Sequence, residues 1–120
     1  MNNDINWNDK EAVIEEVKKD GWLLEHASDE LKNDKEVVIE AVKESGYALK
    51  YASKELREDK EVCFTAAKQN VYSLQYADAS VYFGNTLILD AIKQDAYACT
   101  YVFEYAAKQF QREIQTLKYS

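Results

Sequence analysis

Residues 33–39 of this sequence read NDKEVVI, and the phrase occurs twice more with few changes: residues 8–14 read NDKEAVI and residues 58–64 read EDKEVCF. The three phrases align without gaps and start 25 residues apart. At intervals of 25 residues, Trp22 is followed by three tyrosines and Lys18 by three lysines. Self-similarity at a constant period is typical of repeat architectures. The sequence predicts four units, at about residues 8–32 (unit 1), 33–57 (unit 2), 58–82 (unit 3) and 83–107 (unit 4).

Each phrase has the composition of a helix N-terminus. Asn33 or Asp34 can cap the first free backbone amides, and Glu36 can reach back as a capping-box partner. The apolar residues that follow recur at helical spacing on one broad face. They are Val37, Val38, Ile39, Ala41 and Val42. We therefore expect a helix to start at each phrase and to contact two neighbours.

The second half of each unit is expected to hold a turn and a shorter helix. Gly21 and Gly46 stand where the first helix should end, and glycine can adopt the left-handed conformation of a helix cap without steric cost. A shorter helix is predicted over about residues 47–52, followed by a helical turn capped by Ser53.

The end of the chain differs from the repeat. Residues 95–117 contain no helix breaker and keep apolar residues at helical spacing, which predicts a long closing helix over the end of the stack. The expected fold class is all-α: a short right-handed, solenoid-like stack of four helix-turn-helix units, forming a single domain over residues 1–120.

The composition agrees with this fold. The chain has no proline and three glycines, and 47% of its 120 residues are hydrophobic. Sheet and hairpin signals are therefore few, and the apolar surface is sufficient for one folded domain. No apolar run reaches the roughly 20 residues of a membrane span, and the polar start of the chain is unlike a signal peptide. We expect a cytoplasmic protein, of the producing cell or of a host, that does not bind membranes.

Unit 2 carries the fullest form of the repeat: residues 34–38, Lys43, Gly46, residues 47–53 and residues 55–57. This pattern resembles the repeat known as domain of unknown function 4116 (DUF4116). The likeness covers residues 8–82 and weakens in unit 4. The resemblance implies a helical repeat and implies no activity.

An aromatic pair recurs four residues apart in the predicted shorter helix of the units. On a helical wheel these rings lie beside the apolar face, away from its centre. They either form a stripe that binds a protein partner, because aromatic residues dominate interface hot spots, or pack between units with their polar ends at the edge. The candidate binding residues are Trp22, His26, Tyr47, Tyr51, Tyr72, Tyr76, Tyr97 and Tyr101.

Acidic residues concentrate near the N-terminus. The formal charge is −7, and residues 1–32 hold nine acids and four bases. A protein of this charge lacks the basic face that displaces counterions from nucleic acid, so no direct nucleic-acid binding is expected. The acidic end is either an ordinary solvated surface or a patch that docks onto a basic partner. The candidate patch residues are Asp4, Asp9, Glu11, Glu15 and Glu16.

The sequence offers no recognisable catalytic constellation. His26 is the single histidine, and tyrosine stands at its place in the other units, so ring substitution explains it better than catalysis. Cys63 and Cys99 lie in apolar helical patterns, which favours reduced core residues over a disulfide. The sequence has no zinc-ligand spacing and no glycine-rich phosphate loop. We expect no enzyme activity, no metal and no cofactor.

Three functional hypotheses follow. The first is a non-enzymatic helical-repeat module that binds a macromolecular protein partner in trans. The second is a small acidic inhibitor, of the anti-defence or anti-CRISPR kind, that blocks the basic nucleic-acid-binding surface of a host enzyme. A chain of four units that begins at Met1 agrees with such a free-standing protein. The third is a structural repeat protein that self-associates, and the expected state is a monomer or weak homo-oligomer.

Overall fold

A computed structural model of the chain describes residues 5–78, 80–83, 104, 107–108, 111–112 and 115. All regular elements within these residues are helical, as the sequence predicts. A ten-residue α-helix, a six-residue 3₁₀ helix and a four-residue α-helix follow one another three times. They are α1 (Lys10–Lys19), η1 (Gly21–His26), α2 (Asp29–Lys32), α3 (Lys35–Glu44), η2 (Gly46–Tyr51), α4 (Lys54–Arg57), α5 (Lys60–Gln69), η3 (Val71–Tyr76) and α6 (Ser80–Phe83).

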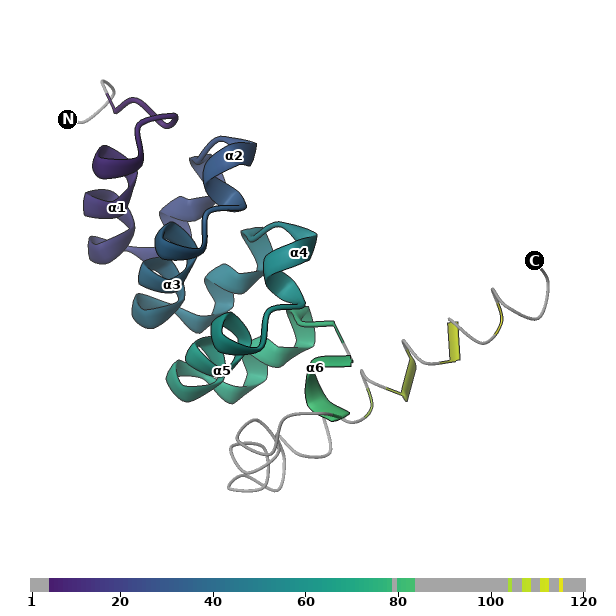
Figure 1. Ribbon diagram of the computed structural model, residues 1–120. Coiled ribbons are helices and arrows are strands. Elements are labelled where there is room, and N and C mark those ends of the chain that lie inside the picture. The colour runs from purple at the N-terminus through teal and green to yellow at the C-terminus, as the bar shows by residue number, and fades with distance from the viewer. Residues whose placement is uncertain are drawn as a thin grey trace.

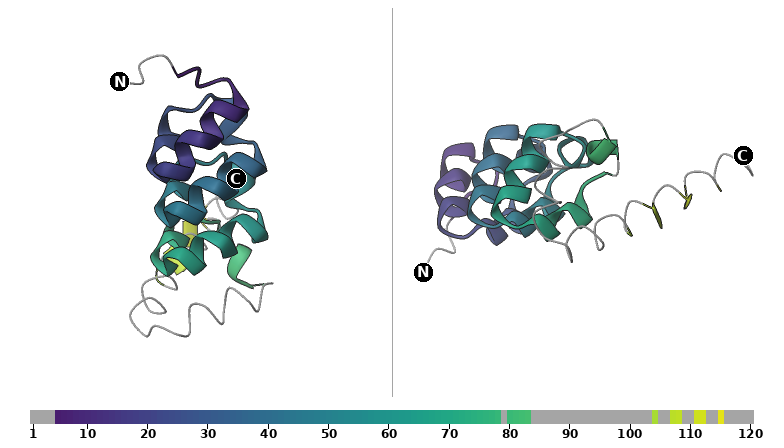
Figure 2. Two further views of the ribbon diagram at one scale, coloured as in Figure 1. Left: turned by 90° about the vertical axis from the view of Figure 1, so that its left-hand side faces the viewer. Right: turned by 90° about the horizontal axis from the view of Figure 1, so that it is seen from below.

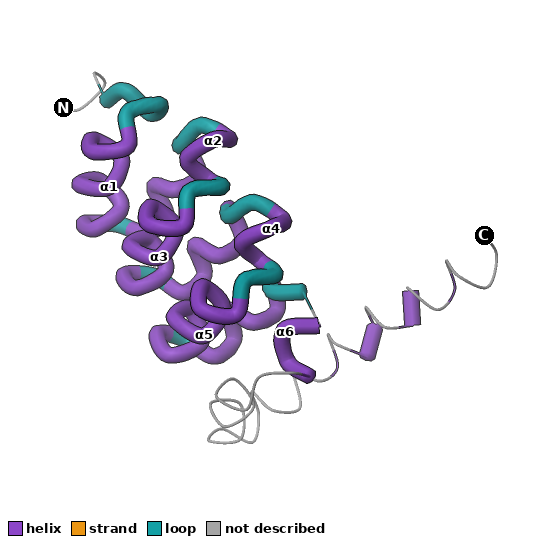
Figure 3. Tube along the Cα trace, viewed as in Figure 1, coloured by secondary structure: helices purple, strands orange, loops and turns teal. Residues whose placement is uncertain are grey.

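The long helices α1, α3 and α5 lie side by side in one row (Figure 1), and α2 and α4 lie in a second row beside them. Short loops join the elements (Figure 3), and the further views in Figure 2 show the same succession of units. One backbone hydrogen bond recurs near the start of each short α-helix and joins it to the residue that precedes its unit. It joins Ser28 N to Trp7 O at 2.9 Å, Ser53 N to Lys32 O at 2.9 Å and Asp78 N to Arg57 O at 3.0 Å.

The predicted helix starts are confirmed, with one correction. The side chains of Asp34 and Asp59 accept hydrogen bonds from the N–H groups of Val37 and Val62, which an N-cap residue is expected to do. Glu36 does not close a capping box, so that prediction was wrong. It is the second helical residue, where a capping box needs the third. Its carboxylate instead lies 3.1 Å from the ammonium group of Lys10.

The predicted left-handed role of Gly21 and Gly46 is also wrong, because no described glycine has a positive φ angle. Both glycines are the first residues of 3₁₀ helices, and these helices pack against the next unit. A Cβ atom on Gly46 would lie 2.6 Å from the carbonyl oxygen of Ala66, and one on Gly21 would overlap the equivalent oxygen of Ala41. Their N–H groups donate to side chains of that next unit: Gly21 to Glu44 Oε1 and Gly46 to Gln69 Oε1, each at 2.6 Å.

The core follows the same period as the sequence. Leu24, Leu49 and Leu74 are fully buried, one on each 3₁₀ helix. Helix α3 contacts both α1 and α5, so the two-sided burial predicted from its wide apolar face is confirmed. The fully buried residues of α3 and α5 are Val37, Val38, Ala41, Val42, Val62, Cys63 and Ala66.

Unit 1 departs from this core at one position. Ala41 and Ala66 are fully buried, but the equivalent residue of α1 is Glu16, whose carboxylate lies 3.4 Å from Lys19 Nζ. The Glu16 side chain keeps 12% of its surface exposed, and covering α1 with another unit in the same way would remove this remaining contact of the charge with water, which is costly. The substitution makes the outer face of α1 a poor surface for further stacking.

Cys63 is a free, buried thiol, as expected. Its Sγ donates a hydrogen bond to the carbonyl oxygen of Arg57 at 3.2 Å, and burial raises its pKa to about 12. Such a thiol is protonated and inert at neutral pH. In the part of the chain that the structure describes, no helix is both long and apolar enough to cross a membrane.

Most of the C-terminal predictions lie outside the described residues. This holds for unit 4, for Cys99 and for most of the closing helix predicted over residues 95–117. Within that helix, the described residues 104, 107–108, 111–112 and 115 are helical.

Candidate functional site

The 3₁₀ helices present a continuous row of aromatic rings, which we call the aromatic row: Trp22, Tyr47, Tyr51 and Tyr76. The ring centroids of Trp22 and Tyr47 are 6.3 Å apart, and those of Trp22 and Tyr51 are 6.0 Å apart. Tyr47 continues the row to Tyr76 at 6.1 Å with an edge-on geometry. These separations are typical of favourable aromatic pairs. The row therefore crosses from unit 1 to unit 3.

The structure pairs these rings differently from the sequence pattern. The sequence places the rings as pairs four residues apart on one helix, whereas each of these contacts joins rings of successive units. The reason is that η1, η2 and η3 pack against one another. Tyr47, Tyr51 and Tyr76 are half-buried in these contacts, while Trp22 keeps 42% of its surface exposed. The alternative of packing between units is therefore confirmed for these rings, and the exposed surface of Trp22 leaves the partner-binding stripe as a hypothesis.

Four predicted binding residues do not belong to the aromatic row as defined above. His26 is exposed, and its ring lies 5.4 Å from that of Trp7. Tyr72 is half-buried on η3. Tyr97 and Tyr101 lie outside the described residues.

The predicted acidic patch has mixed roles. Asp9 caps α1 by accepting a hydrogen bond from Glu11 N at 3.1 Å. Glu16 is largely covered, with its side chain 12% exposed, and pairs with Lys19. Glu11 and Glu15 are exposed. Asp4 lies outside the described residues.

A set of ion pairs between units was not predicted. Lys10 bridges Asp34 and Glu36 at 3.1 Å each, and Lys35 bridges Asp59 at 3.2 Å and Glu61 at 2.8 Å. Each lysine is the first residue of its helix, and its partners are the cap and second residue of the next long helix. The signal was the repeated Asp-Lys-Glu phrase, whose lysine precedes the next two acids by 24 and 26 residues.

These ion pairs change the acidity of their members. Hydrogen bonds to Glu61 and Asp59 raise the pKa of Lys35, and bonds to Glu36 and Asp34 do the same for Lys10. Partial burial alone would raise the pKa of Asp59, but the hydrogen bonds from Val62 N and Lys35 outweigh it and lower that pKa below 3.8. The lysines and glutamates of these pairs are largely exposed, so the pairs contribute little to the stability of the fold.

The depressed pKa of Asp59 predicts a pH-dependent effect of replacing it by asparagine, which retains the cap. Asp59 contributes stability above pH 3.8, and this contribution is lost as the pH falls through its lower folded pKa. Asp59→Asn should be less stable than the wild type at pH 7 by under about 1 kcal/mol. The gap should close below pH 3.8, as measured by urea unfolding at several pH values. Asp9→Asn, which alters a cap without removing a described ion pair, is the control; a constant gap for Asp59→Asn would contradict the prediction.

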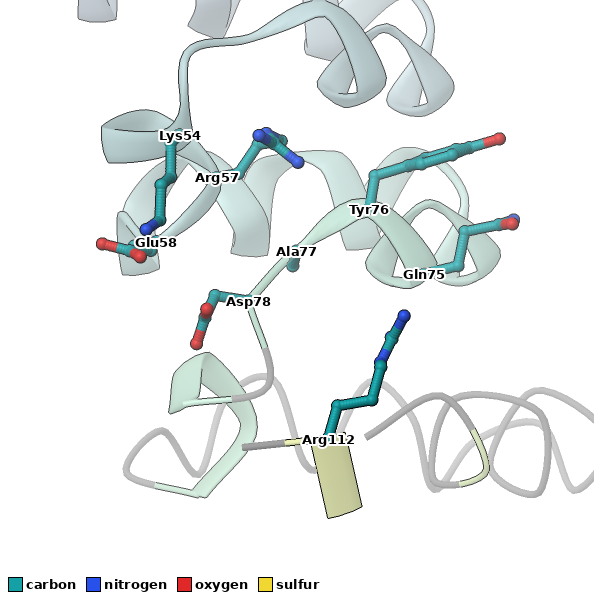
Figure 4. Close-up of a pocket in the computed structure, with 8 residues that line it drawn as sticks. All are labelled: Lys54, Arg57, Glu58, Gln75, Tyr76, Ala77, Asp78 and Arg112. Carbon is teal, nitrogen blue, oxygen red and sulfur yellow. The ribbon is translucent and has the colours of Figure 1, made fainter. Parts of the chain in front are cut away.

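A pocket of about 350 Å³ lies where α4 meets the end of η3 (Figure 4). Lys54 and Arg57 line the pocket from α4. Tyr76, the last ring of the aromatic row, also lines it. The Nε atom of Arg57 is buried and has no hydrogen-bond partner among the described residues. The lining residues are Lys54, Arg57, Glu58, Gln75, Tyr76, Ala77, Asp78 and Arg112.

A metal centre has no support in the described part of the chain, which brings together no group of three or more His, Cys, Asp or Glu side chains that could hold an ion. The ring of His26 lies against that of Trp7, which is an aromatic contact and not a catalytic pairing. The described surface therefore presents the aromatic row, exposed carboxylates and a pocket lined by both basic and acidic side chains.

Comparisons with known proteins give one result. A family model described as "Domain of unknown function (DUF4116)" matches residues 9–57 and 35–81. No curated protein and no solved structure matches the chain.

Proposed function

The chain belongs to the DUF4116 family, and from that premise we propose that it is a non-enzymatic interaction module of helical repeats that binds a protein partner through the aromatic row. The proposed architecture is a right-handed, solenoid-like stack of four units closed by the C-terminal helix. The proposed state is a monomer or weak homo-oligomer in the cytoplasm. Since the family name assigns no activity, support for the function comes from the surface.

The exposure of Trp22 is the observation that carries the proposal. Its ring contacts Tyr47 and Tyr51, and it still leaves 42% of its surface exposed. Tryptophan and tyrosine are enriched in interface hot spots. Rings that are already held by neighbours lose little conformational freedom on binding, which lowers the cost of association.

Partner capture with a Trp22→Ala variant tests this proposal. The protein that the wild type retains from a cell lysate should bind the variant about 30-fold more weakly, because a hot-spot truncation costs about 2 kcal/mol or more. Isothermal titration or surface plasmon resonance with the captured protein gives the affinity. Circular dichroism of each variant establishes that the helical fold is retained.

The matched control is Phe64→Ala, which removes a half-buried ring from α5, outside the aromatic row. This variant should keep its affinity. A partner that binds Trp22→Ala as tightly as the wild type, but loses Phe64→Ala, would place the interface on the row of long helices and refute the proposal.

A second candidate function is the acidic inhibitor of a nucleic-acid-handling host enzyme. It is favoured by the exposed acids of unit 1, the unit that also carries Trp22. These are Glu11, Glu15, Asp20, Glu25, Asp29 and Glu30. Association steered by these charges should slow markedly as salt increases, whereas association through the rings alone should change little.

A further inference from the structure

The indole of Trp22 is an exposed ring that can attract a cation. Tyr47 and Tyr51 contact it, and 42% of the surface of Trp22 remains exposed. The face of an aromatic ring is negative, and among the aromatic side chains that of tryptophan attracts cations most strongly. No cationic side chain of the described residues lies over this ring. A cation that binds it must therefore come from another molecule.

Unit 2 shows that the aromatic row accepts cations. Lys50 Nζ lies 5.6 Å from the centroid of the Tyr51 ring, a distance at which a cation and a ring attract each other. Lys50 is the fifth residue of η2, and the fifth residue of η1 is Glu25. Unit 1 thus carries a carboxylate at the position from which unit 2 supplies its own cation to the row.

Helix geometry places Glu25 on the same side of η1 as Trp22. A 3₁₀ helix has three residues per turn, so side chains three residues apart lie one above the other, about 6 Å apart along the axis. Both residues are exposed, and the carboxylate of Glu25 has no partner among the described residues. Asp20, the exposed cap of η1, accepts a hydrogen bond from Trp22 N at 3.0 Å. An accessible ring and two accessible carboxylates therefore lie together on η1.

A guanidinium group fits this combination better than an ammonium group does. It is planar and stacks on aromatic rings, while the N–H groups at its edge can donate to a carboxylate. An ammonium group is compact, more strongly hydrated and unable to stack. The charge of the region agrees, because residues 1–32 hold nine acids and four bases and will attract a basic segment.

We propose that Trp22 and Glu25 together receive an arginine side chain of the protein partner, with its guanidinium group stacked on the indole and donating to the carboxylate. Tyr47 and Tyr51 hold the indole from the side of unit 2. The inference rests on the proposed function and adds the chemistry of the partner: a segment with an arginine where it meets unit 1.

The test uses the wild-type protein and small probes, so it does not depend on capturing the partner. The tripeptide Gly-Arg-Gly with blocked ends, and the same peptide with neutral citrulline in place of arginine, are titrated separately. The indole N–H signals in nitrogen-15 NMR spectra report binding. The sequence has two tryptophans, Trp7 and Trp22, so a Trp22→Phe variant assigns both signals. The arginine peptide should shift the Trp22 signal and saturate, and the citrulline peptide should bind at least about fivefold more weakly, as the loss of a cation–π contact predicts.

Two matched variants locate the carboxylate. Glu25→Gln should weaken binding of the arginine peptide about threefold or more, as the loss of an exposed ion pair predicts. Glu15→Gln removes the same charge from an exposed position on α1 of the same unit and should leave binding unchanged. The proposal is overturned if the Trp22 signal does not move, if the citrulline peptide or a Gly-Lys-Gly peptide binds as tightly as the arginine peptide, or if the two variants have equal effects.

The same variants separate this inference from the proposed function. If the arginine peptide binds at Trp22 but the captured partner binds Trp22→Ala with full affinity, the proposed function is refuted and the arginine site stands. If Trp22→Ala loses the partner while Glu25→Gln changes neither partner nor peptide binding, the inference is refuted and the proposed function stands.

Discussion

Replacing Gly46 by valine is expected to lower the free energy of unfolding by about 3 kcal/mol or more. A Cβ atom at this position meets Ala66 O at 2.6 Å, Gln69 Oε1 at 3.0 Å and Ser73 Oγ at 3.2 Å. Overpacking typically costs about 1–3 kcal/mol. Displacing Gln69 would also remove the acceptor of Gly46 N–H, for about 1–3 kcal/mol more. Urea unfolding followed by circular dichroism measures the loss.

Two milder variants separate the close contact from a backbone explanation. Asparagine tolerates the left-handed conformation better than alanine. Because Gly46 does not have a positive φ angle, Gly46→Asn should be no more stable than Gly46→Ala. Ser45→Ala, next to it in the chain and without a side-chain cap hydrogen bond, should change stability by under about 0.5 kcal/mol. Near-wild-type stability of Gly46→Asn would mean that the glycine is needed for its backbone after all.

Replacing Ala41 of unit 2 by glutamate, the residue at the equivalent position of unit 1, should lower the free energy of unfolding by a similar amount. Ala41 is fully buried, and Glu16 is its equivalent in α1. Ala41→Glu should cost about 3–5 kcal/mol at pH 7, the range for an uncompensated buried charge. Burial raises the pKa of such a carboxyl, so the loss should grow as the pH rises above about 4.3. Denaturant unfolding at pH 4 and pH 7 tests both the size and the sign.

Ala41→Gln serves as the matched control, since glutamine has nearly the same volume and no charge. Its cost should be similar at the two pH values. Glu16→Ala should alter stability by less than about 1 kcal/mol, because the carboxylate that it removes pairs only with a largely exposed lysine. If Ala41→Glu unfolds with the same midpoint as the wild type, the two-sided burial of α3 is wrong.

Features that depend on neighbouring residues were predictable from the sequence. Asp34 caps its helix because its carboxylate reaches the amide three positions on, and this geometry is local. Ser53 caps α4 for the same reason. The apolar spacing of residues 37–42 indicated a helix covered on two sides, and the contacts of α3 confirm it. Family membership followed from the same repeated pattern.

The candidate site was predicted only in part. The sequence pattern identified Trp22, Tyr47, Tyr51 and Tyr76, but it paired them within a helix, whereas their contacts join successive units. The pocket at Arg57 had no sequence signal, because its lining comes from α4, the end of η3 and a residue much later in the chain.

The sequence by itself determined the period, the helix starts and the apolar face of residues 37–42, because caps, turns and apolar periodicity act over a few neighbouring residues. Only the tertiary structure decided why Gly46 must be a glycine, which acids Lys35 bridges and which rings Trp22 contacts. Each of these is set by the distance and rotation between two units. That geometry is the sum of many weak side-chain contacts over the whole interface, and no local pattern encodes it.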